Sequence, residues 1–167
     1  AKSIYLRALE GFRKYRDTKN EIYLILLSDF ADLHYTVGDY EESIPYYSEW
    51  FQTIEENNLE KSDIYYSNKE KLIESYGNTS QFQLKKVVPL YIDLLDFSKR
   101  TKGIVSLTYI NYLNELAIVY KSAGQTENAI ILYEDFLNST EAVVDSIKEY
   151  DTLLNNLAIT YKSDGNY

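Results

Sequence analysis

The sequence predicts an all-α fold, a solenoid of antiparallel helix pairs. The clearest observation is an internal repeat. The segment from Leu154 to Tyr167 resembles the segment that ends at Gly124, with the aligned glycines 41 residues apart (165 minus 124). A third copy ends at Gly38, 86 residues before Gly124, which is close to two periods. Self-similarity at a fixed period of this length is typical of stacked repeats, in which each unit buries its apolar face against its neighbours.

Composition agrees with this fold class. The chain has 167 residues, of which 45% are hydrophobic and 26% charged, as in a soluble globular protein. Only two prolines and six glycines are present, which suits helices joined by short turns. No apolar run approaches the roughly 20 residues that span a bilayer, so no membrane insertion is expected.

The first half of the chain is predicted to form a succession of helices. Residues 1–16 form the first expected helix, and a polar turn over 17–20 follows it. A second helix is expected over 21–37, because Ile22, Ile25, Leu26, Phe30 and Leu33 recur at helical spacing. Gly38 ends that helix, since glycine tolerates the left-handed conformation of a C-terminal cap. A third helix over 40–56 completes this pair.

The second half continues the pattern. Helices are expected over 62–76 and 82–100, separated by a longer turn at 77–81. Three more follow over 104–123, 126–138 and 141–164, and Thr140 is in position to cap the last one.

The second helix of each unit opens with a small or slim residue. These residues are Ala1, Ser43, Val87 and Ala129, which are 42, 44 and 42 positions apart. A tyrosine stands four residues after each of them, on the same helical face. Small residues allow two helices to approach closely, so these positions mark expected helix contacts.

This pattern, Leu-x-x-Leu-Ala-x-x-Tyr followed by a glycine turn and small-x-x-x-Tyr, resembles the tetratricopeptide repeat. That repeat has a period of about 34 residues, and the longer period here is similar to the extended repeats of kinesin light chains and of many bacterial signalling proteins. The resemblance implies a right-handed superhelix whose concave surface is lined by the first helix of each pair. The same resemblance divides the chain into five parts. These are the second half of a repeat (1–19), three repeats (20–60, 61–102 and 103–139) and the first half of another repeat (140–167).

The two ends lead to an expectation about assembly. The chain opens on the second helix of a repeat and stops where another second helix is due, so we expect a fragment of a larger protein. Terminal repeats of a solenoid normally carry a polar outer face. Apolar surface left open on the last helix, at Leu153, Leu157 and Tyr161, is therefore expected to drive end-to-end self-association.

The resemblance also suggests roles for the eighteen tyrosines. Six fall on inter-helix packing positions of the repeat: Tyr5, Tyr47, Tyr91, Tyr133, Tyr120 and Tyr161. Four others lie off the pattern, where they could contact ligands, although a solvated face is the preferred interpretation: Tyr35, Tyr46, Tyr65 and Tyr66.

The residues around the Leu-Ala pair of each first helix are the candidate binding residues, since the resemblance places them on the concave face. In kinesin-light-chain-like repeats, asparagines there hold the backbone of a bound peptide, and an amide offers both a donor and an acceptor. An ordinary solvated helix face is the equally weighted alternative. The candidate set is Ser28, Asp29, Asp32, Tyr35, Asn114, Glu115, Ile118, Lys121, Asn155, Asn156, Ile159 and Lys162.

Enzymatic and nucleic-acid functions lack support. The single histidine, His34, occupies a packing position and is expected in the core. No cysteine is present, no histidine cluster suits a metal, and no glycine-rich loop follows a strand to hold a phosphate. We expect no cofactor, no metal and no catalytic residue. A net charge of −9 disfavours nucleic acid.

The sequence therefore predicts a non-catalytic scaffold that binds a protein or peptide partner on its concave face. The alternative is a sensory or regulatory module that controls a covalently linked catalytic domain, such as a protease or a histidine kinase.

Overall fold

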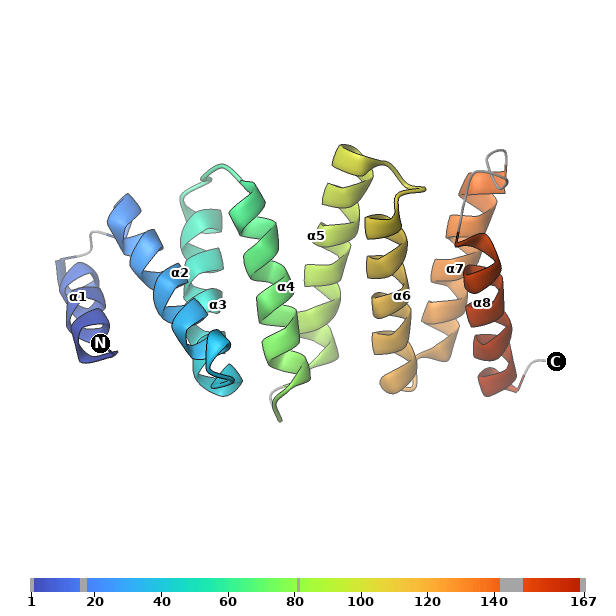
Figure 1. Ribbon diagram of the computed structural model, residues 1–167, viewed down its shortest axis with the longest axis horizontal. Helices are drawn as coiled ribbons and strands as arrows, with labels where there is room; N and C mark the ends of the chain where they lie inside the picture. The colour runs from blue at the N-terminus through green and yellow to red at the C-terminus, as the bar shows by residue number, and fades with distance from the viewer. Residues whose placement is uncertain (1, 16–17, 81, 142–148, 166–167) are drawn as a thin grey trace. The chain divides into compact units, whose positions relative to one another are not determined.

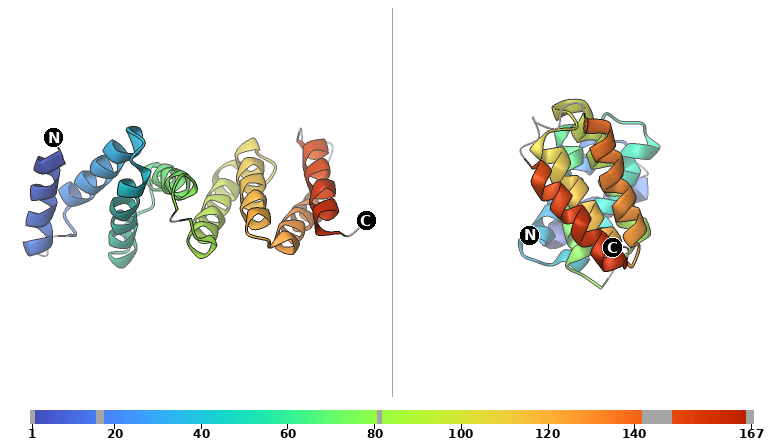
Figure 2. Two further views of the ribbon diagram at one scale, coloured as in Figure 1. Left: turned by 90° about the horizontal axis from the view of Figure 1, so that it is seen from below. Right: turned by 90° about the vertical axis from the view of Figure 1, so that its right-hand side faces the viewer.

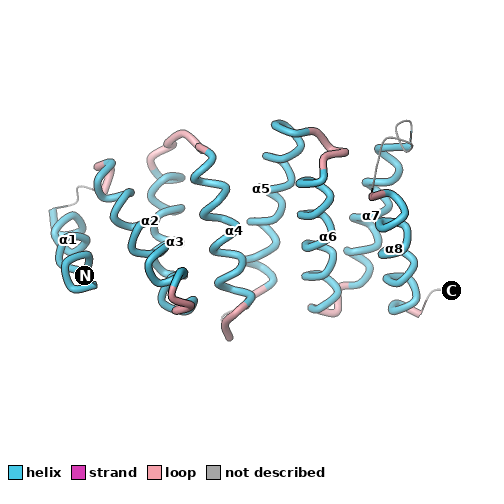
Figure 3. The backbone as a smooth tube through the Cα atoms, in the orientation of Figure 1, coloured by secondary structure: helices cyan, strands magenta, loops and turns pink. Residues whose placement is uncertain are grey.

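The structure is a computed structural model that describes residues 2–15, 18–80, 82–141 and 149–165 (Figure 1). All regular secondary structure in these ranges is helical (Figure 3), which confirms the all-α prediction. The helices are α1 (Lys2–Tyr15), α2 (Glu21–Thr36), α3 (Tyr40–Glu56), α4 (Asp63–Gly77), α5 (Leu84–Lys102), α6 (Leu107–Ser122), α7 (Thr126–Thr140) and α8 (Tyr150–Asp164).

Their bounds agree with the predicted ranges to within a few residues, except at the last helix. The expected start at 141 falls next to residues 142–148, which lie outside the described part of the chain. Thr140 is not an N-cap. It belongs to α7, and its hydroxyl donates to the carbonyl oxygen of Phe136 at 2.8 Å.

The chain divides into two compact units, residues 1–83 and 84–167. In unit 1, α1 packs on α2, α2 on α3 and α3 on α4; in unit 2, the same succession joins α5, α6, α7 and α8 (Figure 2). Within each unit, consecutive helices run antiparallel (Figure 1). We call α2, α4, α6 and α8 the first helices of the predicted repeats, and α1, α3, α5 and α7 the second helices.

Only some of the apolar residues of α2 lie in the core of unit 1. Tyr23, Leu27 and Ala31 are fully buried, whereas Ile22 and Ile25 are exposed. Helix α2 is apolar on several sides. Helical spacing then cannot select the buried face, and packing against α1 and α3 selects it instead.

In unit 2, small residues stand where helices meet. Ala117 of α6 and Ala129 of α7 have no exposed surface, and Leu113 and Leu116 pack beside them. This burial agrees with the role predicted for Ala129. Ser43, its counterpart in α3, is also fully buried, and its hydroxyl lies 2.8 Å from that of Ser75 in α4.

The tyrosines divide partly as predicted. Of the six assigned to packing, Tyr47, Tyr91 and Tyr133 are buried, and the other three are half-buried. The solvated face preferred for Tyr65 and Tyr66 is wrong. Both are buried side chains of α4, and Tyr65 meets the ring of Phe51 in α3 edge-on.

His34 lies in the core, as expected. It is buried between the rings of Phe30 and Tyr46, with centroids 4.9 and 5.9 Å away. Its Nδ1 atom is 3.6 Å from the Asp39 carboxylate in the turn before α3.

Candidate functional site

A ladder of polar contacts joins the two first helices of unit 1. Three side chains of α2 each bond to a side chain of α4 that comes 39 or 40 positions later in the chain. Asn68 Nδ2 donates to Ser28 Oγ at 2.9 Å, Lys71 Nζ donates to both carboxylate oxygens of Asp32 at 2.7 and 2.8 Å, and the Tyr35 hydroxyl donates to Glu74. We call these three pairs the α2–α4 ladder.

The ladder is tied to the second helix α3 through Asp32. The hydroxyl of Tyr47, whose side chain is fully buried, donates to the same carboxylate that Lys71 contacts. Burial and this hydrogen bond raise the pKa of Tyr47 well above its usual value, since both disfavour the phenolate. Similarly, the hydrogen bond to Glu74 raises the pKa of Tyr35 to about 12. Asp32 thus accepts hydrogen bonds from two neighbouring helices.

The ladder changes the interpretation of the predicted residues in unit 1. Ser28, Asp32 and Tyr35 all bond to α4, and only Asp29 of the predicted set stands exposed on α2. The prediction overlooked their partners, which are Asn68, Lys71 and Glu74. A signal was present in the sequence, because Asp32 and Lys71 are opposite charges about one period apart.

In unit 2, the predicted asparagines differ from one another. Asn114 is half-buried, and its Oδ1 accepts from Tyr133 Oη and from Asn156 Nδ2, both at 3.0 Å. An amide oxygen has two lone pairs, so its acceptor capacity is used within the protein. Asn114 therefore takes part in the packing of α6 against α7 and α8. Asn155, at the equivalent position of α8, is exposed.

Two isoleucines give α6 and α8 an apolar surface. Ile118 is 60% exposed and Ile159 is 50% exposed, at positions 41 residues apart. Lys121 is half-buried and Lys162 exposed, each three residues after its isoleucine. We call these four residues, together with Asn155, the α6–α8 face.

Glu115 lies on the α5 side of α6. Burial, together with the charge of Glu115 and a hydrogen bond to it, raises the pKa of Tyr91 above its usual value. The interaction is between α5 and α6, so Glu115 contributes to helix packing in unit 2.

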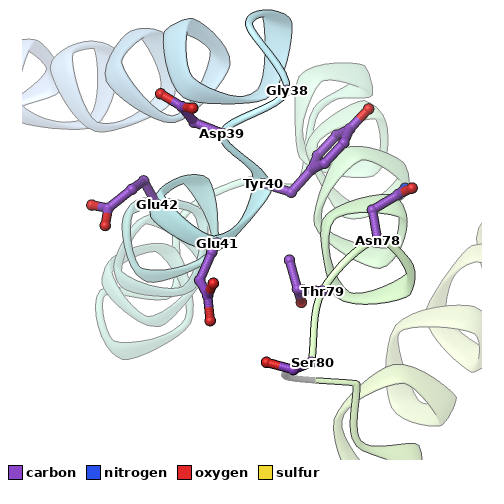
Figure 4. Close-up of a pocket in the computed structure, with 8 residues that line it drawn as sticks. All are labelled: Gly38, Asp39, Tyr40, Glu41, Glu42, Asn78, Thr79 and Ser80. Carbon is purple, nitrogen blue, oxygen red and sulfur yellow. The ribbon is translucent and has the colours of Figure 1, made fainter.

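A hollow lies in unit 1 where the turn before α3 faces the end of α4 (Figure 4). It has a volume of about 450 Å³ and is lined by Gly38, Asp39, Tyr40, Glu41, Glu42, Asn78, Thr79 and Ser80. The carboxylates point in different directions around an open rim (Figure 4). Among the described residues, no group of three or more histidine or acidic side chains is arranged to hold a metal ion.

None of the helices in the described part of the chain has the length and apolar character needed to cross a membrane. Models of known protein families do not match the sequence, and no similar curated protein is found. Solved structures do match. The chain aligns with BtubC (BKLC) from P. vanneervenii at 22% identity and a TM-score of 0.62, covering 99% of this chain and 66% of that one.

It also aligns with the nearly identical TPR-like repeats of a putative kinesin light chain from Podospora anserina, at 15% identity and a TM-score of 0.70. That match covers 98% of this chain and 77% of the other, and a variant of the same protein gives a TM-score of 0.67. The helices are therefore arranged as tetratricopeptide-like repeats, as the sequence resemblance predicted. The chain spans about two thirds of the BtubC (BKLC) chain.

Proposed function

We propose that this protein is a non-catalytic scaffold that binds a peptide or protein segment on the first helices of its repeats, chiefly on the α6–α8 face. The tetratricopeptide-like fold generally serves as a protein-binding scaffold. The observation that carries the proposal is the exposure of Ile118 and Ile159 at equivalent positions of neighbouring repeats.

Apolar side chains at a repeated position suit an extended partner. Burying an isoleucine side chain contributes about 1.5–3 kcal/mol, so two of them can anchor a short segment. Asn155 adds a donor and an acceptor that can pair with a peptide backbone whatever its sequence. Lys121 and Lys162 favour a partner with acidic side chains beside its apolar ones.

Unit 1 is less suited to this role. Its equivalent surface is occupied by the α2–α4 ladder, whose side chains already bond to one another. A partner would have to compete with those bonds, and leaving the buried amide of Asn68 unpaired would cost about 1–3 kcal/mol. We therefore place binding on unit 2.

The experiment is a selection of random peptides displayed on phage against the purified chain, followed by titration of the selected peptides. The test variant replaces Ile118 and Ile159 with glutamate. A matched control places the same changes at Ile92 and Ile131, which are 52% and 46% exposed on the second helices α5 and α7.

We expect the test variant to weaken binding at least about tenfold per isoleucine and the control to leave it unchanged. Asn155→Ala should weaken binding by roughly 2- to 10-fold, the equivalent of one net hydrogen bond. If the control abolishes binding and the test variant does not, the binding surface lies on the second helices and the proposal is wrong.

A further inference from the structure

We propose that unit 1 carries an interaction surface of its own, near the N-terminal ends of α2 and α4, which binds a protein segment whose apolar side chain is flanked by basic ones. The surface is centred on three isoleucines. Ile22, Ile25 and Ile64 are 57%, 50% and 60% exposed, and we call them the isoleucine patch. The proposal adds a surface to unit 1 and does not rest on the function proposed for unit 2.

The isoleucine patch continues the α2–α4 ladder. Ile25 and Ile64 are 39 positions apart (64 minus 25), within the separation of 39 or 40 found in the ladder. They lie one turn before Ser28 and Asn68, whose side chains are joined by a hydrogen bond of 2.9 Å. Because α2 and α4 run in the same direction (Figure 1), the two isoleucines form a further pair in line with the ladder. A segment bound there leaves the ladder bonds intact.

This pair of isoleucines has no counterpart in unit 2. In the repeat alignment, Ile25 corresponds to Asn111 of α6 (25 plus 86) and to Thr152 of α8 (111 plus 41), which are exposed polar residues. Conversely, Ile118 of the α6–α8 face corresponds to Asp32 of the ladder (118 minus 86). The apolar positions differ between the two units, so the isoleucine patch suits a different partner from the α6–α8 face.

Exposed carboxylates surround the isoleucine patch. Glu21 and Asp29 come four residues before and four residues after Ile25, on the same helical face, and Asp63 directly precedes Ile64. Helices α2 and α4 together contain six acidic residues and two lysines. An apolar side chain that docks on the patch is therefore placed between negative charges.

The nearby lysines do not cancel this charge. Lys69 is 3% exposed, and its ammonium lies 4.7 Å from the centre of the Tyr65 ring. Lys71 is bonded to a carboxylate within the ladder. Two further lysines precede the helices, Lys19 and Lys61, which brings the balance to six acidic and four basic residues. The surface stays negative and attracts lysine or arginine side chains of a partner.

Charge selects the kind of occupant. A second copy that docked through the same patch would bring like carboxylates together, and an anionic lipid surface or a nucleic acid would be repelled in the same way. The sequence also predicts an open self-association surface at Leu153, but that side chain is fully buried. The occupant that fits the patch is a cationic segment of another protein, with its apolar side chain on the isoleucines.

The test selects random peptides displayed on phage against a chain that carries Ile118→Glu and Ile159→Glu. These changes disable the α6–α8 face, so the selection acts on the remaining surfaces. We expect the selected peptides to carry an apolar residue with lysine or arginine on both sides, and to bind the wild-type chain equally well.

The patch variant is Ile25→Ser with Ile64→Ser, and it should weaken binding of these peptides at least about tenfold. Its matched control is Ile92→Ser with Ile131→Ser, which removes two isoleucines that are 52% and 46% exposed. The control should leave binding unchanged. Circular dichroism checks that each variant keeps its helices.

The charge variant is Glu21→Gln with Asp29→Asn. It should weaken binding about 2- to 10-fold and make binding less sensitive to salt, because two exposed ion pairs are lost. The matched control is Glu42→Gln with Glu127→Gln, which removes the same charge at exposed positions of α3 and α7. It should change binding less than about 2-fold.

A selection that yields no peptide, or only acidic ones, overturns the proposal. A patch variant that binds the selected peptides as tightly as its control also overturns it. Sedimentation velocity from about 10 µM to about 1 mM tests the other occupant: self-association that the patch variant abolishes would identify a second copy and refute the proposal. Because the α6–α8 face is disabled during selection, each of these failures leaves the function proposed for unit 2 standing.

Discussion

Replacing Asp32 with alanine should destabilise unit 1, because it removes the carboxylate through which α2 is bonded to both α3 and α4. Its carboxylate accepts from Tyr47 of α3 and Lys71 of α4. The Tyr47 side chain is fully buried, and a hydrogen bond to a charged group contributes about 1.5–3 kcal/mol. The side chains of Lys71 and Asp32 are 27% and 37% exposed, so their ion pair adds at most about 1 kcal/mol.

Together these contributions predict a loss of about 2–4 kcal/mol for Asp32→Ala. Tyr47→Phe should cost about 1–2 kcal/mol, because Asp32 keeps its contact with Lys71. The double variant should cost less than the sum of the two, by a coupling energy of about 1–2 kcal/mol. Lys71→Met is the matched control, with a loss of about 1 kcal/mol or less.

Urea denaturation followed by circular dichroism measures the free energies of unfolding. Hydrogen exchange in α2 and α4 should accompany it, because repeats can unfold separately. A coupling energy below about 0.5 kcal/mol between Asp32 and Tyr47 would show that their hydrogen bond contributes nothing specific. The proposed role of Asp32 in joining α2 to α3 would then be refuted.

Three further predictions concern packing, the amides and pH. Ala129→Leu should overpack the contact of α7 with its neighbours and cost about 1–3 kcal/mol, and an unchanged melting temperature would contradict the assigned helix contact. Asn114→Ala should destabilise unit 2 by about 1–3 kcal/mol, because it leaves the Tyr133 hydroxyl without its acceptor; Asn155→Ala, at an exposed position, should change unfolding by less than about 0.5 kcal/mol. Burial raises the pKa of Tyr23 and Tyr133 to about 12, from about 10 in the unfolded chain. The neutral phenols are therefore favoured by folding, so their stabilisation is complete below pH 10 or so and is lost as pH rises toward about 12. Thermal melts over this range, with tyrosine ionisation followed by absorbance, check the direction; a melting temperature that rises with pH would contradict it.

The sequence alone determined the helices and the kind of fold. Glycine turns, apolar spacing and a period near 41 residues can each be recognised in the sequence alone. None of them requires knowledge of which helices are neighbours in space. Small residues at the start of the second helices indicated close helix contacts, and the burial of Ser43 and Ala129 agrees.

Only the tertiary structure decided which sides of the helices face one another. Helix α2 is apolar on several sides, so contacts with α1 and α3 bury Tyr23 and expose Ile22. Asn114 and Asn155 occupy the same repeat position, yet the first accepts two hydrogen bonds and the second is exposed, because α7 packs against α6 and brings Tyr133 to Asn114. Periodicity along a chain specifies a direction around one helix axis, whereas the partner of a side chain depends on the distance and rotation of the next helix, which only packing sets.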